Sequence, residues 1–210
     1  MKKLINNPDQ VVEEMIEGYA LAHKDSVKVL ENKRSIVSTK ETIDKKVGIL
    51  IGGGSGHEPA FLGYIGEGMA DGVAVGNIFA SPPPSPILET TKAIDKGAGV
   101  VYLYGNYAGD VMNFGMAAEL ADMEGITVKS ALTSDDVASA PLEEKEKRRG
   151  IAGEFFVFKT AGAAADKGYD IDGVVRIAEL TNNNTRSMGV GLSPCYLPQT
   201  GEPSFELGED

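Results

Sequence analysis

Three side chains in this sequence combine chemical reactivity with positions where ligands are often bound. His57 follows a glycine-rich stretch, Gly-Gly-Gly-Ser-Gly, and Ser81 and Asp110 each follow a separate apolar run. An imidazole next to a carboxylate can work as an acid–base pair, because the carboxylate fixes the ring tautomer and stabilises the protonated ring. One hypothesis is therefore that His57 and Asp110 act together on a hydroxylated or carbonyl substrate.

The glycine-rich stretch 52–56 is expected to be a loop at the end of a strand. Consecutive glycines can take positive φ and expose a row of backbone N–H groups, so such a loop can curl around a small polar or anionic ligand. The stretch lacks the Lys-Ser/Thr pair that reaches nucleotide phosphates, and it carries an imidazole instead. Pro59 is expected to open a helix after the loop.

Each reactive residue also has a purely structural interpretation. His57 could cap neighbouring backbone, the Ser81 hydroxyl could bond within its turn, and Asp110 could N-cap a following helix. A serine hydrolase would draw on Ser55, but the G-x-S-x-G pattern fails at its last position, where His57 stands. A metal site is not expected, since no His or carboxylate cluster has ligand spacing.

The elements that would position these residues alternate along the chain. Apolar runs of strand-forming residues predict strands at 35–39, 47–51, 74–79, 99–104, 126–132 and 187–193. Apolar residues at helical spacing predict helices at 9–24, 85–96, 111–123, 151–167 and 171–180. This order predicts a doubly wound, mainly parallel α/β sheet flanked by helices. The carboxyl ends of parallel strands share one edge, so His57, Ser81 and Asp110 are expected to meet there.

Composition narrows the possible partners. The net charge of −11 argues against nucleic acid and against anionic membranes, and 42% hydrophobic residues are enough for a buried core. No apolar segment is long enough for a signal peptide or a membrane span, so a cytoplasmic location is expected. Cys195 is the one cysteine and predicts no disulfide. The charged run 142–149 is expected to be solvated.

Four motifs identify a family. GGGSGHEP at 52–59, FASPPP at 79–84, GNYAGDVMNF at 105–114 and RRGIAG at 148–153 resemble the K subunit, or K domain, of dihydroxyacetone kinases. The resemblance covers essentially the whole chain. It implies a homodimer of two-domain protomers that bind dihydroxyacetone. A separate L subunit would carry ATP, or ADP recharged by a phosphotransferase-system protein, with Mg²⁺, and no cofactor would be bound by this chain.

The resemblance also implies roles for individual residues. His57 would be the acid–base residue, and Asp110 would bond a substrate hydroxyl and assist the base. The other residues expected to contact the substrate are Gly54, Ser55, Gly56 and Ser81. In many family members a lysine that touches the substrate precedes the NYxGD motif, where this chain has Gly105. This departure leaves open a related ketose such as erythrulose, or a dihydroxyacetone-sensing transcriptional co-regulator. A further alternative is an unrelated enzyme that uses the His57–Asp110 pair alone.

Family members continue for more than a hundred residues and hold the substrate as a hemiaminal on a second-domain histidine. This chain ends at Asp210, and its two histidines are His23 and His57. We therefore expect residues 1–193 to form the N-terminal substrate-binding domain. Residues 194–210 would begin the connection to a second domain, and the isolated chain is expected to be inactive.

Overall fold

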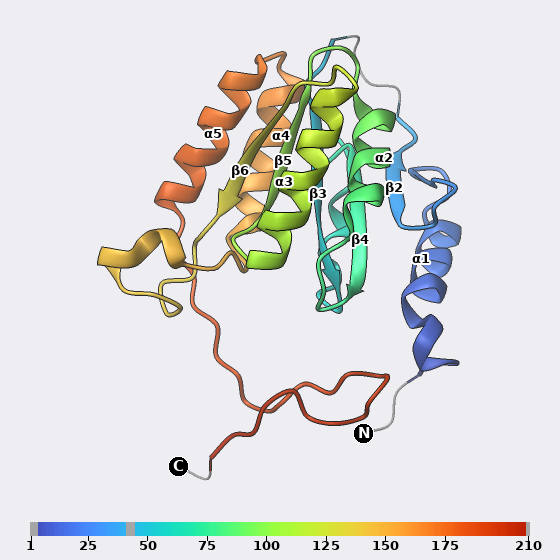
Figure 1. Cartoon of the computed structure of the whole chain (residues 1–210), viewed down its shortest axis with the longest axis vertical. Helices are drawn as coiled ribbons and strands as arrows, with labels where there is room; N and C mark the ends of the chain where they lie inside the picture. The colour runs from blue at the N-terminus through green and yellow to red at the C-terminus, as the bar shows by residue number, and fades with distance from the viewer. Residues whose placement is uncertain (1–3, 41–44, 209–210) are drawn as a thin grey trace.

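The computed structural model describes residues 4–40 and 45–208, and it shows a sheet between two layers of helices (Figure 1). The sheet has six strands in the order β1-β2-β4-β3-β5-β6. The strands are β1 Val27–Val29, β2 Ser35–Ser38, β3 Gly48–Ser55, β4 Gly72–Ile78, β5 Val100–Gly105 and β6 Val128–Thr133. The α-helices are α1 Val11–Ala22, α2 Pro84–Ile94, α3 Ala108–Met123, α4 Glu154–Asp166 and α5 Ile171–Asn184.

The predicted α/β class with a mainly parallel sheet is confirmed. Strands β4, β3, β5 and β6 run parallel, while β1 and β2 are antiparallel additions at one side. β3 and β5 are buried along their whole length, as expected for strands covered on both faces. The chain leaves β3 toward β4 and later returns to its other side at β5. The carboxyl end of β3 is therefore the point where ligands are bound in sheets of this kind.

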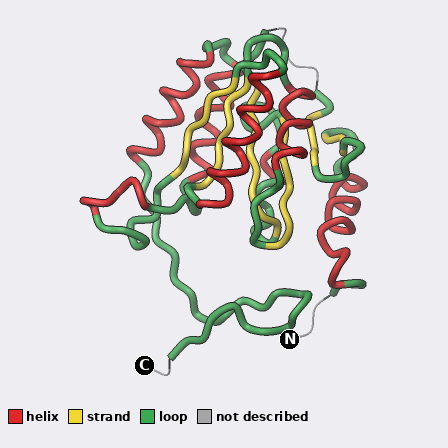
Figure 2. The backbone as a smooth tube through the Cα atoms, in the orientation of Figure 1, coloured by secondary structure: helices red, strands yellow, loops and turns green. Residues whose placement is uncertain are grey.

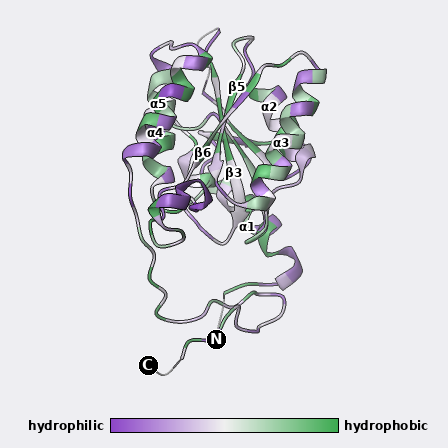
Figure 3. Ribbon diagram, turned by 60° about the vertical axis from the view of Figure 1, so that its left-hand side comes forward, coloured by the Kyte–Doolittle hydropathy of each residue, from purple (hydrophilic) through white to green (hydrophobic). Residues whose placement is uncertain are grey.

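The two faces of the sheet have separate apolar cores. Helices α2 and α3 cover one face around Tyr102 and Phe114, and α4 and α5 cover the other around Phe158. Figure 3 shows these two helix pairs on opposite sides of the strands. Helix α1 adds Val12 and Ile16 to the core of the α4 and α5 face. None of the helices among the described residues is long and apolar enough to cross a membrane.

The glycine-rich stretch is not the loop that was expected. β3 continues through Ser55, and only Gly56 in this stretch has a positive φ, of 95°. The expected helix after Pro59 is also absent, and a 3₁₀ turn at Leu62–Tyr64 stands in its place. Glycine-rich sequence disfavours a helix here, and Gly68 takes a positive φ of 64°.

Two strands differ from the sequence prediction. No strand forms at 187–193, where Val190 and Leu192 are exposed and only Ser187 makes an isolated bridge, to Asp136. The short strand β1 was not predicted. Figure 2 shows that the chain after α5 is one long loop that passes beneath the sheet toward the N-terminal segment. The Gln199 amide reaches that segment with a 3.2 Å hydrogen bond to the Pro8 carbonyl.

The charged run is exposed, as predicted, and forms a 3₁₀ segment at Leu142–Lys147. Arg148, which lies within the run predicted to be solvated, is the exception, since it is buried and donates from Nε to the Ala140 carbonyl at 2.9 Å.

Candidate functional site

His57 lies just beyond the carboxyl end of β3, and its ring is held by the strand that precedes it. Nδ1 is 2.8 Å from the Gly54 carbonyl oxygen. A carbonyl can only accept, so Nδ1 carries the proton and Nε2 keeps a free lone pair. The ring edge packs against Phe79, with 5.2 Å between the ring centroids. The imidazole is therefore oriented by the fold and has one nitrogen free to accept a proton.

The glycines of β3 allow neighbouring groups to approach closely. A Cβ atom at Gly53 would lie 2.3 Å from the Phe61 ring, and one at Gly54 would lie 2.6 Å from the Ala80 backbone nitrogen. Neither distance is compatible with a side chain. The repeated glycine thus serves packing at the strand end, where the aromatic ring and the β4–α2 turn close over the backbone.

Ser55 and Gly56 are next to His57 in sequence, but neither lines the cavity into which His57 opens. The Ser55 hydroxyl is buried and donates a 2.8 Å hydrogen bond to the Gly76 carbonyl of β4. This bond ties β3 to β4 at the point where their register shifts. A buried hydroxyl that is already bonded to backbone is not an accessible nucleophile, and the serine hydrolase interpretation is wrong on this ground.

Asp110 does not cap its helix. α3 begins at Ala108, its N-cap is Tyr107, and no side chain makes the cap hydrogen bond. Asp110 stands in the first turn, and its Oδ1 atom is buried without a hydrogen-bond partner among the described residues. Burial raises the pKa of this carboxyl group, while the nearby Ser81 hydroxyl and His57 act in the opposite direction. A buried acceptor with no partner is costly unless a ligand completes it.

The predicted residues converge on one cavity of about 580 Å³ at the carboxyl edge of the sheet. His57, Gly54, Ser81, Gly105 and Asp110 all line it. The lining residues described in this structure include no lysine or arginine. No group of three or more potential metal ligands occurs in the described part of the chain.

The comparison with protein families settles the relationship. Residues 17–210 match the Dak1 domain. The chain belongs to the Dak1 family. This confirms the family that was expected from the four motifs.

Known relatives of this Dak1 chain include kinases for two ketoses. A PTS-dependent dihydroxyacetone kinase dihydroxyacetone-binding subunit DhaK of Listeria innocua is 51% identical over the whole chain. An L-erythrulose kinase of Pectobacterium atrosepticum is 44% identical over the whole chain. The crystal structure of the dihydroxyacetone kinase of C. freundii matches 97% of the chain with a TM-score of 0.89 and 36% identity. The chain spans 63%, 35% and 38% of these three proteins respectively.

Sequence reasoning missed one polar residue of the Dak1 cavity. Glu154 is the first residue of α4, is buried, and lines the cavity. Its Oε1 accepts a 3.2 Å hydrogen bond from the Thr133 hydroxyl at the end of β6. Burial raises the pKa of Glu154 to about 8. The sequence signal for it is a glutamate at the start of an otherwise apolar helix.

The cavity also has an aromatic wall that the motifs did not indicate. Phe61, Tyr64, Phe79, Tyr107 and Phe155 line it. Tyr64 and Phe155 pack edge to face with centroids 5.6 Å apart, which joins the segment after β3 to the start of α4. Such rings exclude water from one side of a ligand while the carboxyl groups and the imidazole face it.

Proposed function

We propose that this chain binds dihydroxyacetone and presents it for phosphorylation by a nucleotide-bearing L subunit. One observation carries the proposal. Asp110 has a buried, unpartnered carboxylate oxygen in the same cavity as the free Nε2 of His57. A small polyhydroxy ketone supplies a hydroxyl donor for Oδ1 of Asp110 and a second hydroxyl whose proton His57 can accept.

The proposed chemistry needs few groups from this chain. Asp110 accepts a hydrogen bond from one hydroxyl of the substrate and so orients the ketose, and Nε2 of His57 removes the proton of a second hydroxyl as that oxygen attacks the terminal phosphorus. The new P–O bond forms as the bond to the leaving group breaks, and the leaving group keeps the electron pair. The Nδ1–H bond to Gly54 holds the ring in the tautomer that this step requires.

The charge of the cavity supports binding of the ketose by this chain and of the nucleotide by a separate subunit. Its described lining contains Asp110 and Glu154 and lacks lysine and arginine, so a neutral ketose suits it and a triphosphate does not. The nucleotide and Mg²⁺ are therefore assigned to the L subunit. We place the reaction in the cytoplasm, where such a donor is made.

Contacts with other proteins form part of the proposal. The outer side of α3 exposes an apolar group: Val111, Met112, Met116, Leu120 and Met123. Exposed apolar surface of this kind supports a protein contact, and a homodimer and an L-subunit complex are the two assemblies proposed. Sedimentation of the chain alone and with the L subunit measures both.

Erythrulose is the second candidate substrate. Gly105, where the family resemblance implies a lysine in many members, lines the cavity without a side chain, and a relative with 44% identity is an L-erythrulose kinase. A cavity of about 580 Å³ has room for a ketose with one more hydroxymethyl group.

Calorimetric titration of the chain with dihydroxyacetone and with erythrulose tests the function. Binding of either ketose that is lost in Asp110→Asn is the expected result. Phosphotransfer with the L subunit, in a protein with the full length of its relatives, then separates a kinase from a co-regulator. Absence of binding by the folded chain to both ketoses would contradict the proposal.

A further inference from the structure

The carboxyl group of Glu154 occupies a space that the backbone keeps open for it. A Cβ atom at Gly105 would lie 2.4 Å from its Oε1, and one at Gly150 would lie 2.7 Å from the same atom. Both glycines line the cavity with Glu154. A side chain at either position would displace the carboxyl group. The bare end of β5 and the presence of Glu154 are thus one structural feature.

This carboxyl group is buried without a cation. Glu154 is 8% exposed, and no ion pair of the described residues includes it. Thr133 donates to one of its oxygens. Since its pKa is raised to about 8, chiefly by burial, the group is mostly protonated at neutral pH. It then has an O–H to donate as well as oxygens that accept.

Other titratable groups face this carboxyl from each neighbouring element. Asp135 beyond β6 and Asp110 in α3 both oppose its ionisation. Tyr107 interacts with it from the loop between β5 and α3, and Arg149 lies over the Tyr107 ring at 5.9 Å. His57 and Asp110 share the cavity with it. The two nearby carboxylates favour a neutral Glu154, and Arg149 is directed to the tyrosine ring.

We propose that Glu154 is a specificity-determining residue that hydrogen-bonds a hydroxyl group of the bound ketose from the β5 and β6 side of the cavity. This inference rests on the proposed function. The class of ligand is a neutral polyhydroxy ketone. A sugar acid or sugar phosphate would bring negative charge beside Asp110 and Glu154, with no described cation in the lining to balance it.

A neutral donor at this position explains why a carboxyl group can face a substrate that has no charge. A protonated carboxyl group can donate to one hydroxyl oxygen of the ketose and accept from another. Glutamine keeps both functions and the shape of the side chain, whereas leucine keeps only the approximate volume. The two substitutions therefore separate hydrogen bonding from packing.

The test is calorimetric titration of dihydroxyacetone and erythrulose into the wild-type chain, Glu154→Gln and Glu154→Leu at pH 7 and pH 9. Glu179→Gln, in an exposed position on α5, is the matched control. For the ketose that binds, Glu154→Leu is expected to lose about tenfold in affinity, and Glu154→Gln to remain within about threefold. Wild-type affinity is expected to fall about tenfold from pH 7 to pH 9 relative to Glu154→Gln, because the donated proton is lost.

The outcomes separate this inference from the proposed function. If the wild type binds a ketose and both variants bind it equally well, or if the wild type and Glu154→Gln share one pH profile, Glu154 does not read the ligand. If the folded wild type binds neither ketose, the proposed function fails and this inference fails with it. Should Glu154→Leu not fold, the pH comparison with Glu154→Gln still decides.

Discussion

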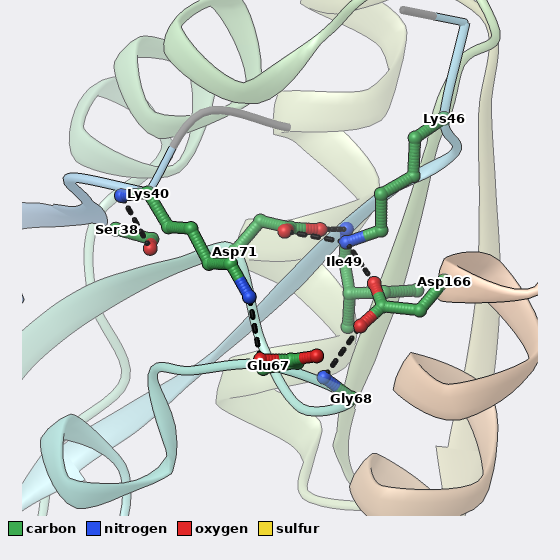
Figure 4. A network of polar contacts seen from close by, with 8 residues as sticks. All are labelled: Ser38, Lys40, Lys46, Ile49, Glu67, Gly68, Asp71 and Asp166. Carbon is green, nitrogen blue, oxygen red and sulfur yellow. Dashed lines mark hydrogen bonds and ion pairs between the residues drawn. The ribbon is translucent and has the colours of Figure 1, made fainter. Parts of the chain in front are cut away.

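At one edge of the sheet the buried ionisable groups form ion pairs with one another, and at the opposite edge the buried carboxyl groups form none among the described residues. Lys46 and Asp71 precede β3 and β4, so they lie at the amino ends of these parallel strands, and Asp166 joins them from the end of α4. Figure 4 shows the Lys46 ammonium between the two carboxylates. Its Nζ is 2.6 Å from Asp71 and 2.8 Å from Asp166.

The backbone completes this paired cluster. Asp71 also accepts from the Ile49 amide at 2.8 Å, and Asp166 accepts from the Gly68 amide at 2.7 Å. At the carboxyl edge, by contrast, Oδ1 of Asp110 has no partner among the described residues, and Glu154 has only the hydroxyl of Thr133. The same residue types therefore secure the fold where they are satisfied and leave an opening for a ligand where they are not.

Lys46→Met gives the largest effect and acts on stability. It leaves the Asp71 and Asp166 carboxylates without their cation, and we expect the free energy of unfolding to fall by about 3 kcal/mol. Urea denaturation measures this change, and Lys46→Met with Asp71→Asn should recover part of it. Ketose affinity of the folded variant should stay unchanged. A loss of ketose affinity without a loss of stability would contradict the assignment of Lys46 to stability and of the carboxyl edge to binding.

His57→Ala acts on the reaction instead. In a protein with the full length of its relatives and with its L subunit, kcat/KM for phosphotransfer should fall about a hundredfold, the scale of a lost acid–base group. His57 is exposed, so the free energy of unfolding should change by less than about 1 kcal/mol. His23→Ala, at the end of α1, is the matched control. Unchanged kcat/KM would remove His57 from the mechanism.

Asp110→Asn, like His57→Ala, should lower activity without lowering stability, but its effect on activity should be smaller. We expect kcat/KM to fall by about tenfold or more, because the amide places a donor where a substrate hydroxyl must donate. The melting temperature should stay level or rise, since the substitution removes the charge of a carboxyl group whose ionisation burial opposes. A large drop in melting temperature with normal activity per folded molecule would restore a structural role for this residue.

The pH dependence of stability concerns Glu154, and its effect within any one pH unit is the smallest of the four. Its pKa is near 4.5 when unfolded and about 8 when folded, so the folded protein holds the proton more tightly between these values. Stability should therefore fall as pH rises from about 4.5 to about 8, by about 1.4 kcal/mol for each pH unit. Thermal melts of the wild type and Glu154→Gln across this range measure the difference. Parallel curves would show that burial does not perturb this group.

Residues whose chemical type alone suggests reactivity, such as His57, were easier to predict than residues whose properties depend on burial and neighbours, such as Glu154. The strands that precede His57, Ser81 and Asp110 have continuous apolar runs, so their order and their common edge followed from the sequence. The prediction of a glycine loop at 52–56 was wrong. Gly53 and Gly54 are in a strand, and the groups that approach them, the Phe61 ring and the backbone of residues 79–80, come from elsewhere in the chain. The expected strand at 187–193 failed because apolar residues alone do not supply a neighbouring strand.

Glu154 shows why part of the site could not be predicted. Its position in the cavity depends on two glycines, Gly105 and Gly150, that are distant in sequence and meet only in the fold. A glutamate at a helix start usually interacts favourably with the helix dipole, and this position alone does not indicate a binding role. Only burial without a cation distinguishes this one, and burial is a tertiary property.

The most direct test is ¹⁵N NMR of the histidine side chains at about pH 8, with and without dihydroxyacetone or erythrulose. The chain has two histidines, so His23→Ala assigns both signals. The predicted result is a His57 ring protonated on Nδ1, with an Nε2 signal that shifts on ketose addition in the wild type and not in Asp110→Asn. A ring protonated on Nε2, or an Nε2 signal that neither ketose moves, would contradict the claim that the unpaired groups at this edge form the substrate site.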